Sequence, residues 1–233
     1  MRNVRSVDQL TVAHDSAWPD VLRLVNDARV PVRLLPADPS TAFDVLNRLQ
    51  VAVGTCLGAI ALHCGGMVID HGWLRLLGAG FEELPSVATV NNLPEPNGEA
   101  ALPALVVALD VVGGQYAIDG GGLFESPGTM CYFAPDTLAW ETLRMSYCDF
   151  VAAALAGDLA ELWFEQRWLG WETEVSALPL GQGITSSPPM YGRRYRREQV
   201  TRTAIAYGEL VGFHNYLAEK LRQLQQADAD ASS

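Results

Sequence analysis

The spacing of apolar residues near the N-terminus predicts two helices with a strand between them. Residues 18–29 have apolar side chains at nearly helical intervals, which is typical of an amphipathic helix. Residues 31–36 are bounded by prolines and predict a short strand instead. Asp38 or Ser40 can cap a second helix that continues to Leu49.

The middle of the chain is predicted to be rich in strands. Its apolar runs are short and separated by glycines, including Gly65-Gly66, Gly113-Gly114 and a triplet that begins at Gly120. The apolar run at 102–110 is continuous, which is typical of a central strand buried on both faces. The expected strands are residues 57–63, 67–70, 73–77, 102–110, 115–118 and 130–134. The first two of them form a predicted hairpin.

The last third of the chain is predicted to be helical. Ser146 and Asp149 have the spacing of a shortened capping box, and Gly157 stands where a C-cap is expected. Residues 208–226 predict a long helix whose apolar positions follow a heptad-like rhythm. We expect this helix to dock on the domain, with a helical homodimer seam as the alternative. Residues 227–233 are expected to form a frayed tail.

Together these elements predict an α+β fold. Its mixed or mainly antiparallel central sheet, at about residues 57–134, is flanked by N-terminal and C-terminal helices. The length of 233 residues supports a single domain at 1–207, followed by the C-terminal helix at 208–226.

Charge and hydropathy exclude several classes of function. The formal net charge of −11 argues against a general nucleic-acid binder, because phosphate neutralisation needs an excess of Lys and Arg. The longest nearly uncharged apolar stretch, residues 51–62, is shorter than the ~20 residues of a membrane helix. The first residues lead into polar sequence without an apolar signal region, so we expect a cytoplasmic protein that does not bind membranes.

The cysteines and arginines each allow two interpretations. Cys56, Cys64, Cys131 and Cys148 form no C-x-x-C pair, so we expect reduced, buried thiols. Most of the positive charge is arginine, and four arginines at 193, 194, 196 and 197 surround Tyr195. This cluster could bind a phosphate or an acidic partner. Alternatively it is a solvated loop, as charge runs in an acidic chain usually are.

Two groups of titratable residues are candidates for chemistry. His63, Asp70 and His71 could bind a divalent metal or form an acid–base pair if the predicted hairpin brings them together. Their spacing matches no zinc motif, and the favoured alternative is a turn in which Asp70 accepts backbone amides and His71 is half buried. Carboxylates also end predicted strands, at residues 110, 119 and 136. They could serve a glycosidase or a hard metal ion, or they could satisfy local amides.

Other motifs do not indicate an enzyme. The glycine-rich turns match neither a dinucleotide-binding nor a Walker loop, and the chain has no G-x-S-x-G elbow. Trp163, Phe164, Trp168 and Trp171 form an aromatic cluster that is either core or, where exposed, an interface anchor.

Several motifs, taken as a set, resemble a known bacterial family. They include Asp-His-Gly-Trp-Leu-Arg at 70–75 and Tyr-Phe-Ala-Pro-Asp-Thr-Leu at 132–138, within a resemblance that spans roughly residues 18–189. The family is domain of unknown function 2625, and the resemblance implies no activity. One departure is residues 86–91, where a tryptophan is expected before Asn91, so a contact built on that ring would be altered.

A looser pattern of strands, glycine turns and a helix start at Ser146 is similar to the SUKH immunity superfamily. That resemblance implies an α+β domain that binds partner proteins, often bacterial toxins. The acidic charge would suit a basic toxin through electrostatic steering.

Three functional hypotheses follow. The first is a non-enzymatic protein-binding module, immunity-like or regulatory, whose partner is a basic toxin or a regulatory target. The second is a metal-assisted hydrolase or lyase that uses His63, Asp70, His71 and Asp110, and the third is a binder of small ligands. We assign no catalytic residue, metal ligand or cofactor. The candidate binding residues are Asp70, His71, Trp73, Asp110, Tyr116 and Tyr132.

Overall fold

The computed structural model describes residues 4–12, 16–96, 102–124, 126–192 and 194–231. Its main feature is a seven-stranded sheet in which neighbours in sequence are also neighbours in space, and every pair is antiparallel. The strands are β1 (Val32–Leu35), β2 (Gly66–Ile69), β3 (Leu74–Leu77), β4 (Ala104–Asp110), β5 (Gln115–Asp119), β6 (Thr129–Ala134) and β7 (Ala139–Ser146). The α+β class with a mainly antiparallel sheet is therefore confirmed.

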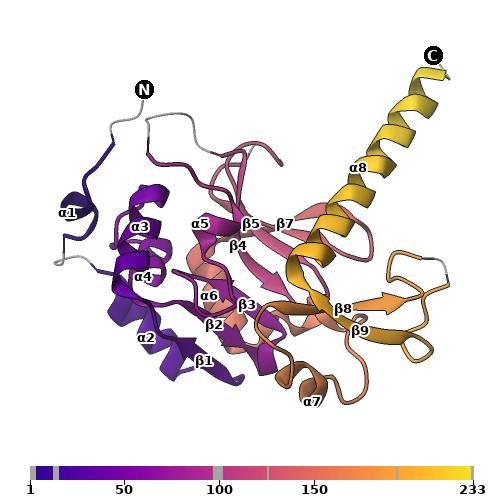
Figure 1. Cartoon of the computed structure of the whole chain (residues 1–233), viewed down its shortest axis with the longest axis horizontal. Helices are drawn as coiled ribbons and strands as arrows, with labels where there is room; N and C mark the ends of the chain where they lie inside the picture. Colours follow the sequence, from indigo (N-terminus) through magenta and orange to yellow (C-terminus); the bar gives the residue numbers. More distant parts are fainter. Residues whose placement is uncertain (1–3, 13–15, 97–101, 125, 193, 232–233) are drawn as a thin grey trace.

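Helices and a second small sheet complete the fold (Figure 1). The α-helices are α1 (Val7–Leu10), α2 (Trp18–Asn26), α3 (Pro39–Leu49), α4 (Cys56–His63), α5 (Val87–Val90), α6 (Tyr147–Ala156), α7 (Trp171–Ser176) and α8 (Tyr207–Ala231). The 3-10 helices among the described residues are η2 (Asp70–Gly72) and η3 (Asp158–Trp163). The second sheet pairs β8 (Gln182–Ser187) with β9 (Thr201–Ala206). Figure 1 shows α1–α4 on one side of the molecule and β8, β9 and α8 on the other.

One predicted strand is wrong, and the sheet is wider than expected. Residues 57–63 belong to α4, whose first turn is capped by the Thr55 side chain accepting from the Gly58 amide. All but the last two residues of α4 are buried, so this helix has no polar face. Periodicity cannot distinguish such an apolar helix from a buried strand. The sheet also extends beyond the predicted range of 57–134, because β1 precedes that range in the sequence and β7 follows it.

Local signals in the last third were sufficient to place α6. The Ser146 and Asp149 side chains form the expected reciprocal capping box, and Gly157 ends the helix with a φ of 82°. This left-handed conformation costs glycine little because it has no Cβ.

The C-terminal helix is longer than predicted and lies partly away from the body. It begins at Tyr207 and continues to Ala231, past the expected end at residue 226. Leu210 is buried, whereas Phe213 and Leu221 are 50% and 45% exposed. Figure 1 shows the far end of α8 projecting into open space. The alternative homodimer seam stays a prediction.

The described residues also bear on the thiols and on membrane insertion. Four free cysteines are present; Cys56, Cys64 and Cys131 are buried as expected. Cys148 is instead exposed, because the face of α6 that packs on the core is the one with Phe150, Val151 and Ala154.

Within the described ranges, no helix combines the length and apolar character needed to cross a bilayer.

Candidate functional site

Asp110, at the end of β4, is a fully buried carboxylate with four hydrogen-bond donors. The amides of Val112 and Gly114 donate to Oδ1 at 3.1 and 2.7 Å. The hydroxyls of Tyr116 and Tyr132 donate to Oδ2, each at 3.3 Å. Burial raises the pKa of Asp110 to about 6, although all four hydrogen bonds favour the charged form. Asp110 therefore titrates closer to neutrality than an ordinary aspartate.

The network around Asp110 continues through the core. The rings of Tyr116 and Tyr132 lie opposite each other in the β5–β6 register and stack with centroids 4.7 Å apart. Trp163 Nε1 donates to the Tyr116 hydroxyl at 2.7 Å, and Gln166 Nε2 donates to the Tyr132 hydroxyl at 3.1 Å. Trp73, Tyr116 and Tyr132 are each no more than 2% exposed. A ligand could reach them only if the core opened, so their assignment as binding residues stays a prediction.

Asp70 lies in a second polar group, paired with Arg167. The Arg167 guanidinium lies over the rings of three tryptophans, here called the tryptophan cage: Trp73 at 4.9 Å, Trp163 at 4.7 Å and Trp171 at 3.9 Å from the ring centroids. Cation–π contacts and the ion pair offset part of the hydration that the guanidinium loses, although its buried Nε atom has no hydrogen-bond partner among the described residues. Sequence reasoning missed Arg167; the only signal was an arginine within the aromatic cluster.

The residues of the metal-assisted alternative have separate partners. His63 is exposed and stacks on Trp18 at 5.3 Å, whereas His71 meets Trp171 edge-on at 5.8 Å. Asp70 binds Arg167, and Asp110 binds tyrosines and amides. Among the described residues, no group of three or more His, Cys, Asp or Glu side chains could hold a metal ion. Within the described part of the chain, these four residues do not come together as one ligand set.

The other strand-end carboxylates are also apart from one another. Asp119 accepts from the amides of residues 121, 123, 124 and 126. Burial opposes the charged form, but these amides prevail and lower the pKa of Asp119 to about 2. Asp136 is exposed in the turn after β6. For Asp119, the satisfaction of local amides is the observed role.

A group of aromatic and basic residues adjoins the tryptophan cage, because the buried Trp168 ring contacts Trp73. Phe164 and Leu169 are 65% and 101% exposed. Arg197 donates to the Phe164 carbonyl at 2.7 Å, and its guanidinium lies 5.6 Å from that ring. Arg202 lies 4.2 Å from the ring of Trp168. We call Phe164, Trp168, Leu169, Arg197 and Arg202 the basic–aromatic surface.

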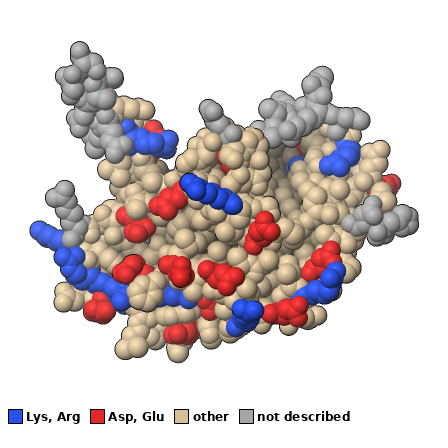
Figure 2. All heavy atoms as spheres, turned by 180° about the vertical axis from the view of Figure 1, so that it is seen from behind, with Lys and Arg blue, Asp and Glu red and all other residues tan. Residues whose placement is uncertain are grey.

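The arginine cluster adjoins the basic–aromatic surface. Arg194 and Arg196 are exposed in the segment that leads to Arg197, and Arg193 lies outside the described residues. Figure 2 shows basic side chains gathered at the lower left margin of its face, with acidic side chains spread across the lower half. The aromatic cluster predicted from the sequence contributes to both core and surface. Its tryptophans, Trp163, Trp168 and Trp171, are buried, whereas its phenylalanine, Phe164, is exposed.

Comparisons with known proteins agree with the resemblance noted in the sequence. The family model described as "Protein of unknown function DUF2625" matches residues 7–210. The uncharacterised protein YbfG of Escherichia coli (strain K12) is 36% identical over 221 residues, covering 94% of this chain and 100% of that protein. An uncharacterised protein of Haemophilus influenzae (strain ATCC 51907 / DSM 11121 / KW20 / Rd) is 30% identical over 189 residues, covering 80% and 83%. No solved structure matches. These matches do not include the SUKH superfamily, so that resemblance stays a prediction.

Proposed function

The chain belongs to the DUF2625 family, and we propose that it acts as a non-catalytic module that binds an acidic segment of another protein. The basic–aromatic surface carries this proposal. Exposed aromatic and aliphatic side chains flanked by arginine are the composition of binding hot spots. Cytoplasmic location is part of the proposal, supported by four free thiols.

The surface is suited to binding because its support is rigid. Trp168 packs against Trp73 at 5.8 Å, and its Nε1 donates to Glu174 at 2.8 Å. Arg202 is already stacked on Trp168, so its side chain loses little freedom when a partner binds. Phe164 and Leu169 offer apolar area that the described chain leaves uncovered.

Charge favours an acidic partner at this surface. The whole chain has a net charge of −11, so a local group of arginines stands out against an acidic background. An acidic segment would be attracted to the arginines and repelled by most of the remaining surface, which orients the encounter. Net charge alone suggests a basic toxin as the partner. Such a toxin would bind the acidic part of the protein surface and not the basic–aromatic surface.

The two partner classes are separated by charge reversal. The wild-type chain is used to capture partners from an extract of its source bacterium, and each purified partner is then measured by calorimetry at low and high salt. We expect Arg197→Glu and Leu169→Ser each to weaken binding about tenfold or more. Arg29→Glu, an equal charge change at an exposed site beside α2, serves as the control.

Two results would contradict the proposal. If Arg197→Glu strengthens binding, the partner is basic and uses the acidic surface. If both variants and the control bind equally well, the basic–aromatic surface is not the binding site.

A further inference from the structure

The edges of the seven-stranded sheet are protected against pairing with another chain. β1 has only four residues and stands between Pro31 and Pro36. The pairing of β7 with β6 is irregular between Thr142 and Ser146, where Arg144 has a φ of 54°. Short edge strands, prolines and bulges are the devices by which proteins keep the outward amides and carbonyls of a sheet edge from binding a further strand.

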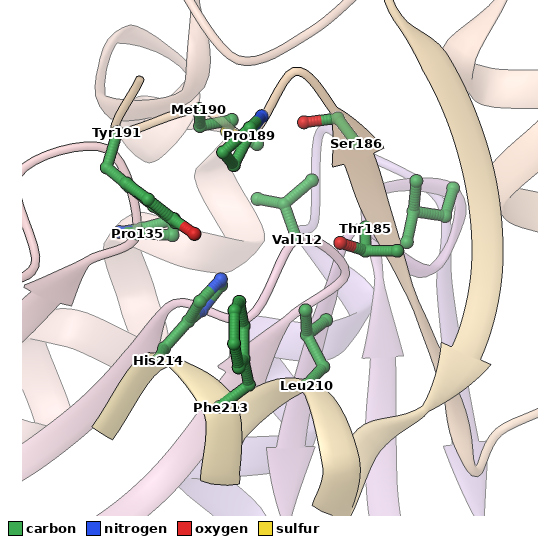
Figure 3. Close-up of a pocket in the computed structure, with 11 residues that line it drawn as sticks. Val112, Pro135, Thr185, Ser186, Pro189, Met190, Tyr191, Leu210, Phe213 and His214 are labelled. Carbon is green, nitrogen blue, oxygen red and sulfur yellow. The ribbon is translucent and has the colours of Figure 1, made fainter. Parts of the chain in front are cut away.

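β9, in the two-stranded sheet, lacks these protections. Its six residues pair with those of β8 without a shift in register, and it contains no proline or lysine. β8 is the inner strand of the pair, because the Ile184 amide donates to the Val111 carbonyl at 2.6 Å. Val112, the next residue, lines a narrow cleft together with Thr185 and Ser186 of β8 (Figure 3). Among the described residues, β9 has no strand on its other side.

The register shows which backbone groups of β9 face outward. Because the Ile184 amide points to Val111 and not to β9, Ile184 and its partner Ala204 form a non-hydrogen-bonded pair. The N–H and C=O groups of Ala204, and by alternation those of Arg202, therefore point away from β8. Within the described part of the chain, no hydrogen bond is made to these groups, and Ala204 is exposed. This edge is open to a partner.

We propose that the acidic segment bound by this protein adds to β9 as a third, extended strand. The inference rests on the proposed function and names the conformation of the bound partner. Main-chain hydrogen bonds to Arg202 and Ala204 would supply affinity, as in other cases of strand addition. Arg202 also stacks on Trp168, and its side chain donates to the Arg197 carbonyl. A strand on this edge would consequently pass beside the basic–aromatic surface.

Charge favours an acidic segment over a second copy of this chain at β9. Arg202 is the only charged residue of the strand, so an acidic side chain opposite it would form an ion pair and meet no carboxylate on β9. Two copies of β9 paired with each other would instead bring two sets of arginines together. Like charges on neighbouring strands weaken their pairing.

The probe is a blocked synthetic peptide of alternating glutamate and valine, long enough to span β9. Its binding to the full chain is measured by NMR, and we expect a dissociation constant of about 1 mM or lower. Two N-methylated versions are matched controls, one methylated at the glutamates and the other at the valines. Only alternate amides of an added strand face its neighbour, so one version should bind about tenfold more weakly and the other like the parent peptide.

Hydrogen exchange in the wild-type chain reports on the edge directly. The Thr203 amide bonds to β8 in this register, whereas the Ala204 amide faces outward. Saturating peptide should slow exchange of the Ala204 amide about tenfold and leave that of Thr203 nearly unchanged. Equal exchange of the Ala204 amide with and without peptide overturns the inference, as does a failure of the peptide to bind or equal binding of the two methylated versions.

A pair of variants separates this inference from the proposed function. Ala204→Pro removes the outward N–H and keeps the bonds to β8, since proline is tolerated on the free side of an edge strand. It should weaken binding of the peptide and of a captured partner about fivefold, whereas Ala204→Val should leave both unchanged. If Arg197→Glu weakens binding of the partner and Ala204→Pro does not, the proposed function stands and strand addition is wrong. If neither variant weakens it, both are contradicted.

Discussion

Replacement of Asp110 by asparagine should change how the stability of the protein depends on pH. The asparagine side chain would keep an oxygen for the amides of Val112 and Gly114, which now donate to Oδ1. Its Nδ2 would donate to a tyrosine hydroxyl where Oδ2 now accepts from Tyr116 and Tyr132. The substitution therefore removes the buried charge with little loss of hydrogen bonding.

The magnitude follows from the shift of the Asp110 pKa, from 3.8 to about 6 on folding. Because the folded state holds this proton more tightly, its contribution to stability is fully present below pH 3.8 and is lost as the pH rises to about 6. Each pKa unit corresponds to about 1.4 kcal/mol, so the loss is roughly 3 kcal/mol. Asp110→Asn has no such loss. Its free energy of unfolding, relative to wild type, should rise by about this amount between pH 4 and pH 7.

Urea unfolding at several pH values measures this difference directly. Asp119→Asn is the matched control, because the Asp119 pKa is lowered to about 2 and its effect must have the opposite sign. That variant should be less stable than wild type near neutrality and should approach it as the pH falls. A difference between Asp110→Asn and wild type that stays constant from pH 4 to pH 7 would refute the reasoning.

Further predictions concern packing, capping and thiol reactivity. Arg167→Lys removes the planar guanidinium from the tryptophan cage and should lower the free energy of unfolding by about 2–4 kcal/mol in urea; an unchanged midpoint would contradict this. Ser146→Ala removes the cap of α6 and should cost about 1 kcal/mol in the same assay. Maleimide should label exposed Cys148 well before Cys64, because burial raises the pKa of the Cys64 thiol to about 11. Mass spectrometry that finds Cys64 labelled equally fast would oppose that expectation.

Elements with strong local signals could be read from the sequence. The capping box of Ser146 and Asp149 and the end of α6 at Gly157 depend on contacts within a few residues, and both are as expected. The apolar run at 102–110 contains β4. β7, by contrast, was missed; all of its residues are at least partly exposed, so it lacks the apolar run of a core strand. α4 was misassigned because its apolar residues surround the whole helix.

The candidate residues illustrate the same limit. Asp70, Trp73, Asp110, Tyr116 and Tyr132 were chosen from the sequence as polar and aromatic residues in the strand-rich middle. Their partners could not be chosen in that way, since Arg167 lies 97 positions from Asp70. Tyr116 meets Tyr132 only because β5 and β6 pair in one particular register. A shift of one residue would have turned either ring to the other face.

The sequence alone determined the α+β class, the family and the boundaries of α3 and α6, because these depend on short-range spacing and on motifs. Only the tertiary structure decided the order of the seven strands, the burial of Asp110 and the exposure of Phe164. It also placed His214 of α8 against Gly113 and opposite Tyr191, which comes from a different part of the chain. Such arrangements depend on which distant segments pack together, and the cost of closing the chain between them is not visible in local spacing.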